Sequence, residues 1–433
     1  MPGAPPCRCV QELPLRHSAV IRPGYAAAFR CIGPACEDTC CAGWRVDIDR
    51  ATYDKYQSVP PGPLRILIDE HVERAPAQGG ETPPSLFATV RLPASLHCPF
   101  HNPDRLCQIQ VEHGPDYLSE VCRTYPRNLL TIDRLEDRTL SLSCPEAARL
   151  VLLHPNLMAR NSEPARTCAW DDRMGDGQTT DLQPLRSYFW PLREFIVALV
   201  LNRAYPLWQR LFLLGAFCRR LQARESGELK RAFPALLKDF SAAVASGGLS
   251  AGIESIPADL PLQLSLLAEL VKLGAAGSRV NPRLLDCLST FAEGVHLCQT
   301  QPGVEQIALY QAAYSRFYQP FFQRHPAILE NLLLNRLFLS LFPLGRSMLD
   351  PGLEPEPEKE FLKLAIEFAL VKGVLIGVAA RHREEFSIPH VVHTVQVLSK
   401  YFEHNQDFLA RAPQLLAGRK LDNAHGVTML LKN

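Results

Sequence analysis

The stretch FRCIGPACEDTCCAGWRVDID, residues 29–49, sets the character of the first part of this chain. It begins a set of eight cysteines in two runs with unequal spacings: Cys31, Cys36, Cys40 and Cys41, and then Cys98, Cys107, Cys122 and Cys144. Short loops between cysteines need little closure entropy to bring several thiols together. Soft thiolates select zinc, copper(I) or iron–sulfur clusters over hard ions such as magnesium. The spacing therefore predicts a metal site ligated by cysteines within residues 31–144.

The arrangement of these cysteines favours an iron–sulfur cluster over zinc. Zinc sites commonly use two CxxC pairs, and the sequence contains no CxxC pair. Unequal spacings and the adjacent Cys40 and Cys41 fit a 4Fe–4S cubane better, because its irons face different directions. Four ligands suffice for one cluster, so the surplus thiols are left for a second metal, a redox pair or ordinary packing.

The remaining cysteines have simpler explanations. Cys168, Cys218, Cys287 and Cys298 are scattered through apolar sequence, and free cysteine is among the residue types most often buried. We expect these four to be inert packing residues. Cys7 and Cys9 stand in a polar N-terminal stretch, where they are either further ligands or have no role.

Composition narrows the class of protein. The chain has 433 residues and is 47% hydrophobic, so it can bury a large core. Its formal charge of +1 gives no net positive electrostatic field that would attract nucleic acid or an anionic membrane. The start lacks the apolar core of a secretory signal, and no segment reaches the roughly 18 apolar residues that span a bilayer. We therefore expect a cytoplasmic protein, in which 14 cysteines cannot be a stable disulfide framework.

The second part of the chain has a helical pattern. Apolar residues recur at intervals of three and four in SYFWPLREFIVALVLNRA (187–204) and KEFLKLAIEFALVKGVLIGVAA (359–380). We expect eight or more helices between residues 185 and 416, with Ser387 as an N-cap. The predicted fold class is mainly α: an irregular cysteine-rich metal-binding region over residues 1–150, a polar linker over 151–183 and an all-helical domain over 184–433.

Two further segments of the cysteine-rich region carry weaker signals. Residues 60–93 contain PPGP, QGG and TPP and are expected to be a flexible insertion with a short helix near 64–72. In WRVDID, Asp47 and Asp49 alternate with apolar residues, as on the solvated face of a short strand.

The motif CRTYPRN places Arg123, Tyr125 and Arg127 directly after Cys122. Guanidinium groups beside a cluster would offset thiolate charge or hold a substrate carboxylate through paired hydrogen bonds. A surface salt bridge explains the same arginines equally well.

Two longer segments around these cysteines are specific enough to be compared with a known protein family. CEDTCCAGWRVDID (36–49) and CPFHNPDRLCQIQVEHGPDYLSEVCRTYPR (98–127) resemble the flagellin lysine-N-methylase (FliB) family and a broader group of small proteins with a CxxxCC cluster. ENLLLNRLFLSLFPLG (330–345), EFALVKGVLIGVAA (367–380) and FEHNQDFL (402–409) are similar to later segments of the FliB family. The resemblance covers most of the chain.

The resemblance implies methyl transfer from S-adenosylmethionine to lysine side chains of flagellin, with an iron–sulfur cluster involved and flagellin as the partner. Two features differ from better-known enzymes. The chain lacks the CxxxCxxC triplet of radical S-adenosylmethionine enzymes, and no strand followed by GxGxG marks a Rossmann-type cofactor site. The cofactor site is expected to be of another kind.

A lysine ammonium has an ordinary pKa of about 10.4 and must lose a proton before it can accept a methyl group. Candidates for this base are Glu330, Glu403 and His404, of which we favour Glu330 and His404. The residues that we expect to bind the cofactor are Arg123, Arg127 and Asn335. Asn331 and Asn405 are further polar candidates, although capping, helix bridging and local hydrogen bonds explain such side chains as well.

Two other functions remain open from the sequence. A metal-binding adaptor, whose helical domain docks a partner protein, would explain the cysteines and the helices without a catalytic base. A thiol redox enzyme using Cys40 and Cys41 is the weaker alternative, because a disulfide between sequence neighbours strains the peptide between them.

Overall fold

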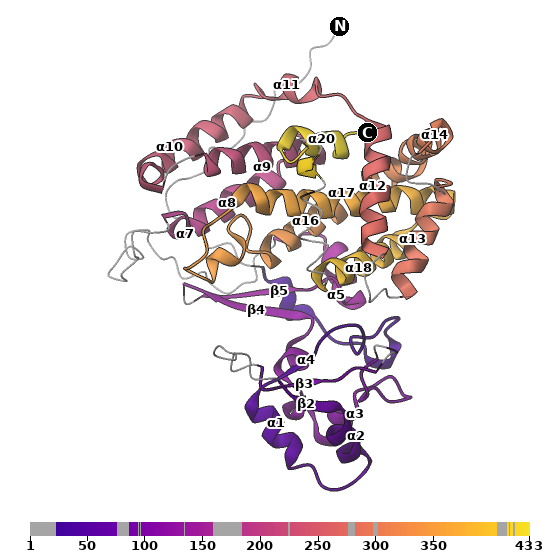
Figure 1. The fold of residues 1–433 in the computed structure, drawn as a ribbon. Coiled ribbons are helices and arrows are strands. Elements are labelled where there is room, and N and C mark those ends of the chain that lie inside the picture. Colours follow the sequence, from indigo (N-terminus) through magenta and orange to yellow (C-terminus); the bar gives the residue numbers. More distant parts are fainter. Residues whose placement is uncertain are drawn as a thin grey trace.

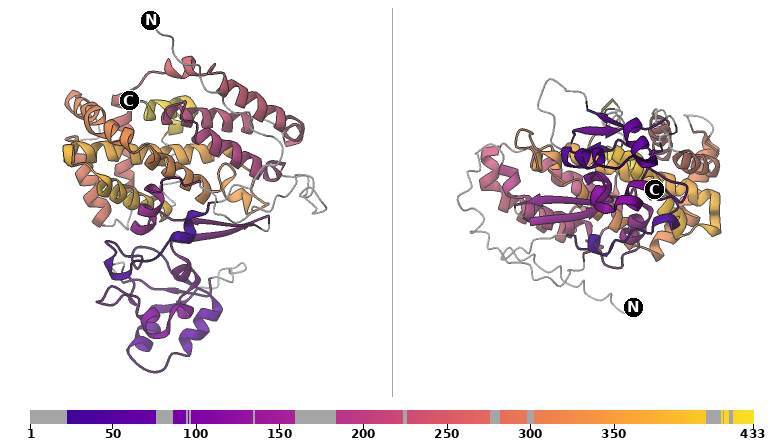
Figure 2. Two further views of the ribbon diagram at one scale, coloured as in Figure 1. Left: turned by 180° about the vertical axis from the view of Figure 1, so that it is seen from behind. Right: turned by 90° about the horizontal axis from the view of Figure 1, so that it is seen from below.

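The computed structural model describes residues 23–75, 86–93, 95, 97–133, 135–158, 184–223, 226–275, 282–297, 302–404, 414, 416–418 and 421–433. A large helical part is joined to a smaller part, coloured indigo to purple, that carries most of the cysteines (Figure 1). Figure 2 shows from behind that the smaller part projects from one end of the helical part. The expectation of a mainly helical protein is confirmed. Cys7, Cys9, Cys168, Cys298, Asn405 and residues 159–183 of the expected linker lie outside the described residues.

The smaller part is built from short elements. They are η1 (Tyr25–Ala28), η2 (Gly33–Ala35), β1 (Asp47–Ile48), α1 (Arg50–Gln57), α2 (Pro63–His71), β2 (Val72–Arg74), β3 (Ala88–Val90), α3 (Gln108–His113), η3 (Pro115–Tyr117) and α4 (Glu120–Thr124). The three strands form an antiparallel sheet in the order β1-β3-β2, which pairs Asp47 with Thr89 and Val72 with Val90. Val46, Ile48 and Ile68 belong to the small apolar core of this part.

The expected insertion over residues 60–93 is more structured than the sequence indicated. The short helix near 64–72 is confirmed as α2, but β2 and β3 also lie in this segment and complete the sheet. The expectation for Asp49 is wrong, because this residue follows β1 and its side chain accepts a hydrogen bond from the Thr52 amide at the start of α1. It is an N-cap, a role that short acidic side chains fill well.

A hairpin and a helix connect the small part to the large one. They are β4 (Arg127–Ile132), β5 (Leu135–Leu140) and α5 (Pro145–Leu152). Their buried side chains, including Ile132, Leu140 and Val151, belong to the same apolar core as the helical part. The core therefore includes residues on both sides of position 150, while the division at 150 and 183 stays a prediction.

The large part consists almost entirely of helices. They are α7 (Pro184–Ser187), α8 (Phe189–Val200), α9 (Leu207–Gln222), α10 (Ser226–Ala245), α11 (Ser250–Glu254), α12 (Leu260–Ala275), α13 (Pro282–Gly294), α14 (Val304–Ala313), the π-helical η4 (Tyr314–Tyr318), α15 (Gln319–Arg324), α16 (Ala327–Leu339), η5 (Gly345–Met348), α17 (Pro357–His382), η6 (Arg383–Glu385), α18 (Ile388–His404) and α20 (Ala424–Leu431). The expectation of eight or more helices is confirmed, and α18 begins directly after Ser387.

Helix α17 is the central element of the large part, and α9, α13, α14 and α18 pack around it. Two glycines allow α13 and α17 to cross closely. A Cβ atom added at Gly294 would lie 2.0 Å from the carbonyl oxygen of Gly377, and one added at Gly377 would lie 2.9 Å from that of Phe291. Cys218 and Cys287 are buried in this core, as the sequence indicated. None of the described helices combines the length and apolar character needed to cross a membrane.

Candidate metal centre

Five of the eight cysteines lie near one another in the small part: Cys40, Cys41, Cys98, Cys107 and Cys122. Burial raises the pKa of Cys98 to about 12, and negative charge on Cys122, Cys107 and Cys40 adds to this rise. The Cys98 amide donates a 2.7 Å hydrogen bond to the carbonyl oxygen of Cys41, and an isolated β-bridge pairs Ala42 with His97. Backbone pairing thus brings the CEDTCC and CPFH segments together. We call these five cysteines the lower group.

The other three cysteines, Cys31, Cys36 and Cys144, form a second set that we call the upper group. Burial raises the pKa of Cys144 to about 12, with further contributions from charge on Cys36 and Cys31. Cys144 directly precedes α5, whereas Cys31 and Cys36 flank η2. The loop over residues 36–41 therefore runs from the upper group to the lower group.

The donor chemistry of the lower group suits a thiophilic centre. All ten cysteines among the described residues are free thiols. Within Cys40 and Cys41, the hydrogen bond between the two side chains lowers the pKa of Cys40 and raises that of Cys41. A lowered pKa favours the thiolate, which is the form that binds metals. In the described part of the chain, however, no three His, Cys, Asp or Glu side chains lie in an arrangement that could hold a metal ion. The thiols are neighbours, and their role as ligands stays a prediction.

An aromatic pair connects the lower group to the hairpin. Trp44 donates a 2.6 Å hydrogen bond through its indole nitrogen to the carbonyl oxygen of Cys40. Its ring lies 5.7 Å from the ring of Tyr125. The Tyr125 hydroxyl is 3.1 Å from the Ser143 hydroxyl, beside Cys144. Tyr125 thus lies between the cysteines and the first residues of α5.

A buried network of charged side chains lies next to Ser141 and Ser143. Ser141 donates a hydrogen bond to Glu403 of α18. Arg336 of α16 lies 3.4 Å from Glu403 and 2.5 Å from Glu367 of α17. Burial raises the pKa of both glutamates, more than the neighbouring Arg336 guanidinium lowers it. Two carboxyl groups therefore share one guanidinium at the junction of the two parts.

Glu330, one of the two favoured bases, has a different environment. Its carboxylate pairs with Arg203 and Arg210, each at 2.7 Å. Burial alone would raise its pKa, but the hydrogen bonds from the two guanidinium groups outweigh burial and lower it. A carboxylate held by two arginines is a weak base, so these contacts favour a structural role. The catalytic role of Glu330 stays a prediction.

Asn335 and His404, the predicted cofactor-binding and catalytic residues of the helical part, lie in different places. Asn335 is fully buried and uses both ends of its amide, accepting from Tyr25 and donating to the Leu140 carbonyl oxygen at 3.0 Å. These contacts make it a bridge between η1, β5 and α16. His404 ends α18, and its side chain lies outside the described residues. The proposed roles of both residues remain predictions.

The two arginines after Cys122 differ in their contacts. Arg127 donates a 3.2 Å hydrogen bond to the carbonyl oxygen of Phe29, and its guanidinium lies 4.9 Å from the centre of the Phe29 ring. Arg123 is exposed on α4, next to the lower group. Arg123 is therefore the better placed of the two to meet a ligand from solution, and the cofactor role of both stays a prediction.

Comparison with known proteins adds the decisive observation. Residues 193–430 match the family model described as the FliB lysine N-methylase C-terminal domain. The chain belongs to the FliB lysine N-methylase family. The resemblance seen in the sequence is thereby confirmed. The match includes α16, α17 and α18, which carry Arg336, Glu367 and Glu403.

Relatives of this FliB-family chain share most of its length. It is 23% identical over 410 residues to the protein named lysine-N-methylase of Salmonella typhimurium. The matched region covers 91% of this chain and 94% of that protein. The lysine-N-methylase of Salmonella choleraesuis is equally similar. The flagellar biosynthetic protein FliU of Salmonella muenchen is 31% identical over 146 residues, 34% of this chain and 83% of FliU. No solved structure matches the chain.

Proposed function

We propose that this chain is a protein lysine N-methyltransferase that transfers the methyl group of S-adenosylmethionine to lysines of flagellin in the bacterial cytoplasm. Its membership of the FliB lysine N-methylase family carries this proposal, together with the similarity along 91% of the chain to a protein named lysine-N-methylase. The name of FliU adds a flagellar context. Flagellin as substrate, S-adenosylmethionine as donor and an iron–sulfur cluster are parts of the proposal.

The lower group would hold the cluster. Cys98, Cys107 and Cys122 come from separate loops and short helices, and Cys40 has the lowered pKa that favours a thiolate. Four thiolates of this kind complete the usual ligand set of an iron–sulfur cluster. When bound, such a cluster supplies Lewis-acidic iron or one-electron chemistry. The chain's own contribution is to place the thiols beside Tyr125 and the buried network behind it.

Glu403 is the base that the described contacts favour. A carboxylate whose pKa is raised by burial accepts a proton more readily than one held by two arginines, as Glu330 is. Glu403 and Glu367 also share a single guanidinium, so ionising both leaves excess negative charge in a buried place. The ammonium of a substrate lysine would balance this charge on entry.

The proposed step conserves atoms and charge. Glu403 takes a proton from the substrate ammonium, which leaves a neutral amine with a free electron pair. S-adenosylmethionine supplies a methyl group on a positively charged sulfur. As the amine nitrogen bonds to the methyl carbon, the carbon–sulfur bond breaks and its electron pair returns to the sulfur. The exposed guanidinium of Arg123, assisted by Arg127, would hold the carboxylate of the methionine portion.

The test is methyl transfer from labelled S-adenosylmethionine to purified flagellin. The wild-type chain is expected to label flagellin lysines, and Glu403→Gln should lower the rate by roughly 10²–10⁴-fold, the usual contribution of a general base. This deficit should narrow as the pH rises toward the lysine pKa of about 10.4, because more of the substrate is then already neutral. Glu356→Gln is the matched control, since Glu356 is an exposed residue paired with Lys359.

The outcomes separate the parts of the proposal. If the wild-type chain places no label on flagellin, the proposed activity is wrong, and the alternative of a metal-binding adaptor stands. If flagellin is labelled but Glu403→Gln behaves like Glu356→Gln, the activity stands and the assignment of the base is wrong.

A further inference from the structure

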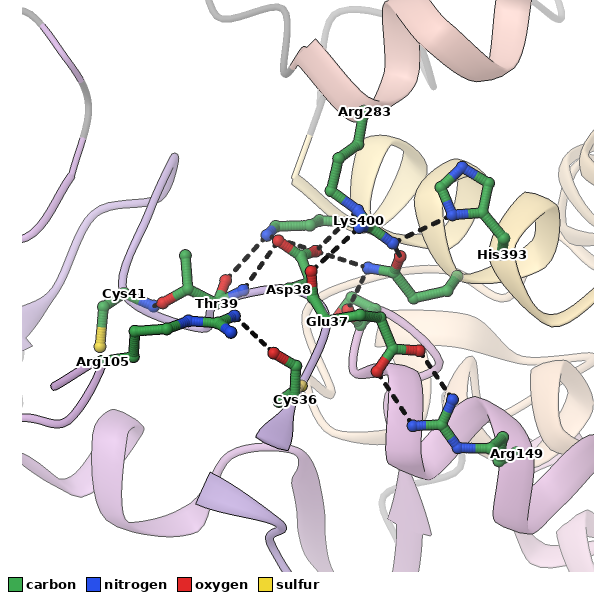
Figure 3. A network of polar contacts seen from close by, with 12 residues as sticks. Cys36, Glu37, Asp38, Thr39, Cys41, Arg105, Arg149, Arg283, His393 and Lys400 are labelled. Carbon is green, nitrogen blue, oxygen red and sulfur yellow. Dashed lines mark hydrogen bonds and ion pairs between the residues drawn. The ribbon is translucent and has the colours of Figure 1, made fainter. Parts of the chain in front are cut away.

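The loop over residues 36–41 contains a buried acid, Asp38, that has no part in the proposed methyl transfer. In the sequence, Asp38 is midway between Cys36 of the upper group and Cys40 of the lower group. Its side chain is only 7% exposed. Lys400 lies 3.0 Å from its carboxylate, and Gln396 donates to the same oxygen at 2.8 Å. Figure 3 shows Asp38 surrounded by side chains from the helical part.

The partners of Asp38 come from two helices that are distant in sequence. Lys400 and Gln396 are one turn apart on α18, whereas Arg283, on α13, lies 3.9 Å from the carboxylate. The positive charges of Lys400 and Arg283 balance the buried aspartate. A buried carboxylate without such partners would be strongly unfavourable, so the loop is held where these cations are.

Each of these three partners also donates a hydrogen bond to a backbone carbonyl oxygen next to a cysteine. Lys400 donates to the carbonyl oxygen of Thr39 at 2.9 Å, and Gln396 donates to that of Ser143 at 2.8 Å. Arg283 donates to the carbonyl oxygen of Glu37 at 3.0 Å. The residues contacted are thus neighbours of Cys36, Cys40 and Cys144.

Asp38 also orders the loop internally. Its carboxylate accepts a 2.8 Å hydrogen bond from the Thr39 amide, and the Thr39 hydroxyl accepts a 3.0 Å hydrogen bond from the Cys41 amide. These bonds fix the backbone that presents Cys40 and Cys41. Release of the carboxylate would free the Thr39 amide directly, and movement of Thr39 would weaken the hydrogen bond of the Cys41 amide.

Helix α18 connects this contact to the proposed base. Gln396, Lys400 and Glu403 follow one another at intervals of four and three residues, so they lie along one side of the helix. The same helix therefore contacts the cysteine loop and carries the buried carboxyl group. A shift of the loop on α18 would change the position of the cysteines relative to Glu403.

We infer that Asp38 is a positioning residue, which fixes the Cys36–Cys41 loop against α18 and so sets the place of the cysteine-bound centre relative to Glu403. The anchoring of the loop is independent of the proposed function, whereas its catalytic consequence rests on that function. Charge-assisted hydrogen bonds such as those to Asp38 are the stronger kind, so this side chain contributes strongly to holding the loop.

The first test measures the loop itself, in the full-length chain freed of metal. Asp38→Asn and Lys400→Met should speed amide hydrogen exchange at Thr39 and Cys41 by about tenfold or more, because both variants remove the ionic contact. Asp54→Asn is the control, since Asp54 forms an exposed pair with Arg50. Exchange at Thr39 and Cys41 that is unchanged in both anchor variants would overturn the inference.

The second test measures iron bound per chain after anaerobic reconstitution, and the kcat and KM of methyl transfer. Asp38→Asn should retain less iron than wild type and have a lower kcat, and Asp38→Glu, which keeps the charge, should recover part of both. If exchange rises in Asp38→Asn while iron content and kcat stay at wild-type values, Asp38 does not position the centre. If the wild-type chain binds no iron and transfers no methyl group, the proposed function fails, and hydrogen exchange still decides whether Asp38 anchors the loop.

Discussion

Replacing Arg336 with methionine is the most direct perturbation of the buried charge network. The side chains of Arg336, Glu367 and Glu403 are 15%, 9% and 13% exposed. Methionine removes the guanidinium but fills similar space, so both carboxyl groups lose their shared cation. Breaking a buried ion pair in this way lowers the free energy of unfolding by about 3–5 kcal/mol.

The loss should depend on pH with a defined sign. Burial already raises the pKa of Glu367 and Glu403 above the ordinary value of 4.5. A carboxyl group with a raised pKa in the folded state stabilises the fold while protonated and loses this contribution as pH rises from 4.5 through the raised pKa. Without Arg336 both pKa values rise further. The variant should therefore lose more stability at pH 7 than at pH 5.

Urea denaturation followed by circular dichroism at the two pH values measures this effect. Arg381→Met is the matched control, because Arg381 and Glu293 are more than half exposed and such surface pairs contribute about 0–1 kcal/mol. Adding Glu403→Gln to Arg336→Met should restore part of the stability at pH 7. If Arg336→Met loses no more stability than Arg381→Met at pH 7, the ion pairs of Arg336 with Glu367 and Glu403 do not stabilise the fold.

Three further predictions concern the helical part. Gly377→Ala should lower the melting temperature, because its Cβ would lie 2.9 Å from the Phe291 carbonyl oxygen and overpacking costs about 1–3 kcal/mol; an unchanged melting temperature would contradict the close crossing of α13 and α17. Burial lowers the pKa of Lys372 to about 7, so unfolding free energy should rise with pH between about 7 and 10.5, and Lys372→Met should flatten that rise in urea titrations. Arg193→Met leaves Asp137 buried without its guanidinium, and calorimetry should show a loss of about 3–5 kcal/mol, far above that of an exposed pair.

Local patterns in the sequence predicted the features that depend on local physics. The three- and four-residue periodicity predicted α8 and α17, because each helix must bury an apolar surface. Ser387 was predicted as an N-cap because small polar residues satisfy free amides at helix starts, and α18 begins directly after it. The spacing predicted that all eight cysteines would converge, whereas the structure divides them into the lower and upper groups, and backbone pairing near Cys41 and Cys98 joins the two halves of the lower group. Their role as ligands stays a prediction.

Features that depend on distant partners were not predictable in this way. Asp38 stands among cysteines in CEDTCC, and its partner Lys400 is more than 360 positions away in the sequence. Glu330 looked like a free base because the sequence does not show its arginine partners, Arg203 and Arg210. β2 and β3 were missed because each has only three residues and acquires its pairing from the sheet.

The central claim is that thiols from separate segments converge on one iron–sulfur centre beside a helical catalytic part. Its most direct test is anaerobic purification followed by analysis of iron, acid-labile sulfide and zinc in the wild-type chain and in Cys107→Ala. We predict iron and sulfide in equal amounts in the wild-type chain, and loss of both in the variant. A colourless wild-type protein that contains stoichiometric zinc and no iron would contradict the claim.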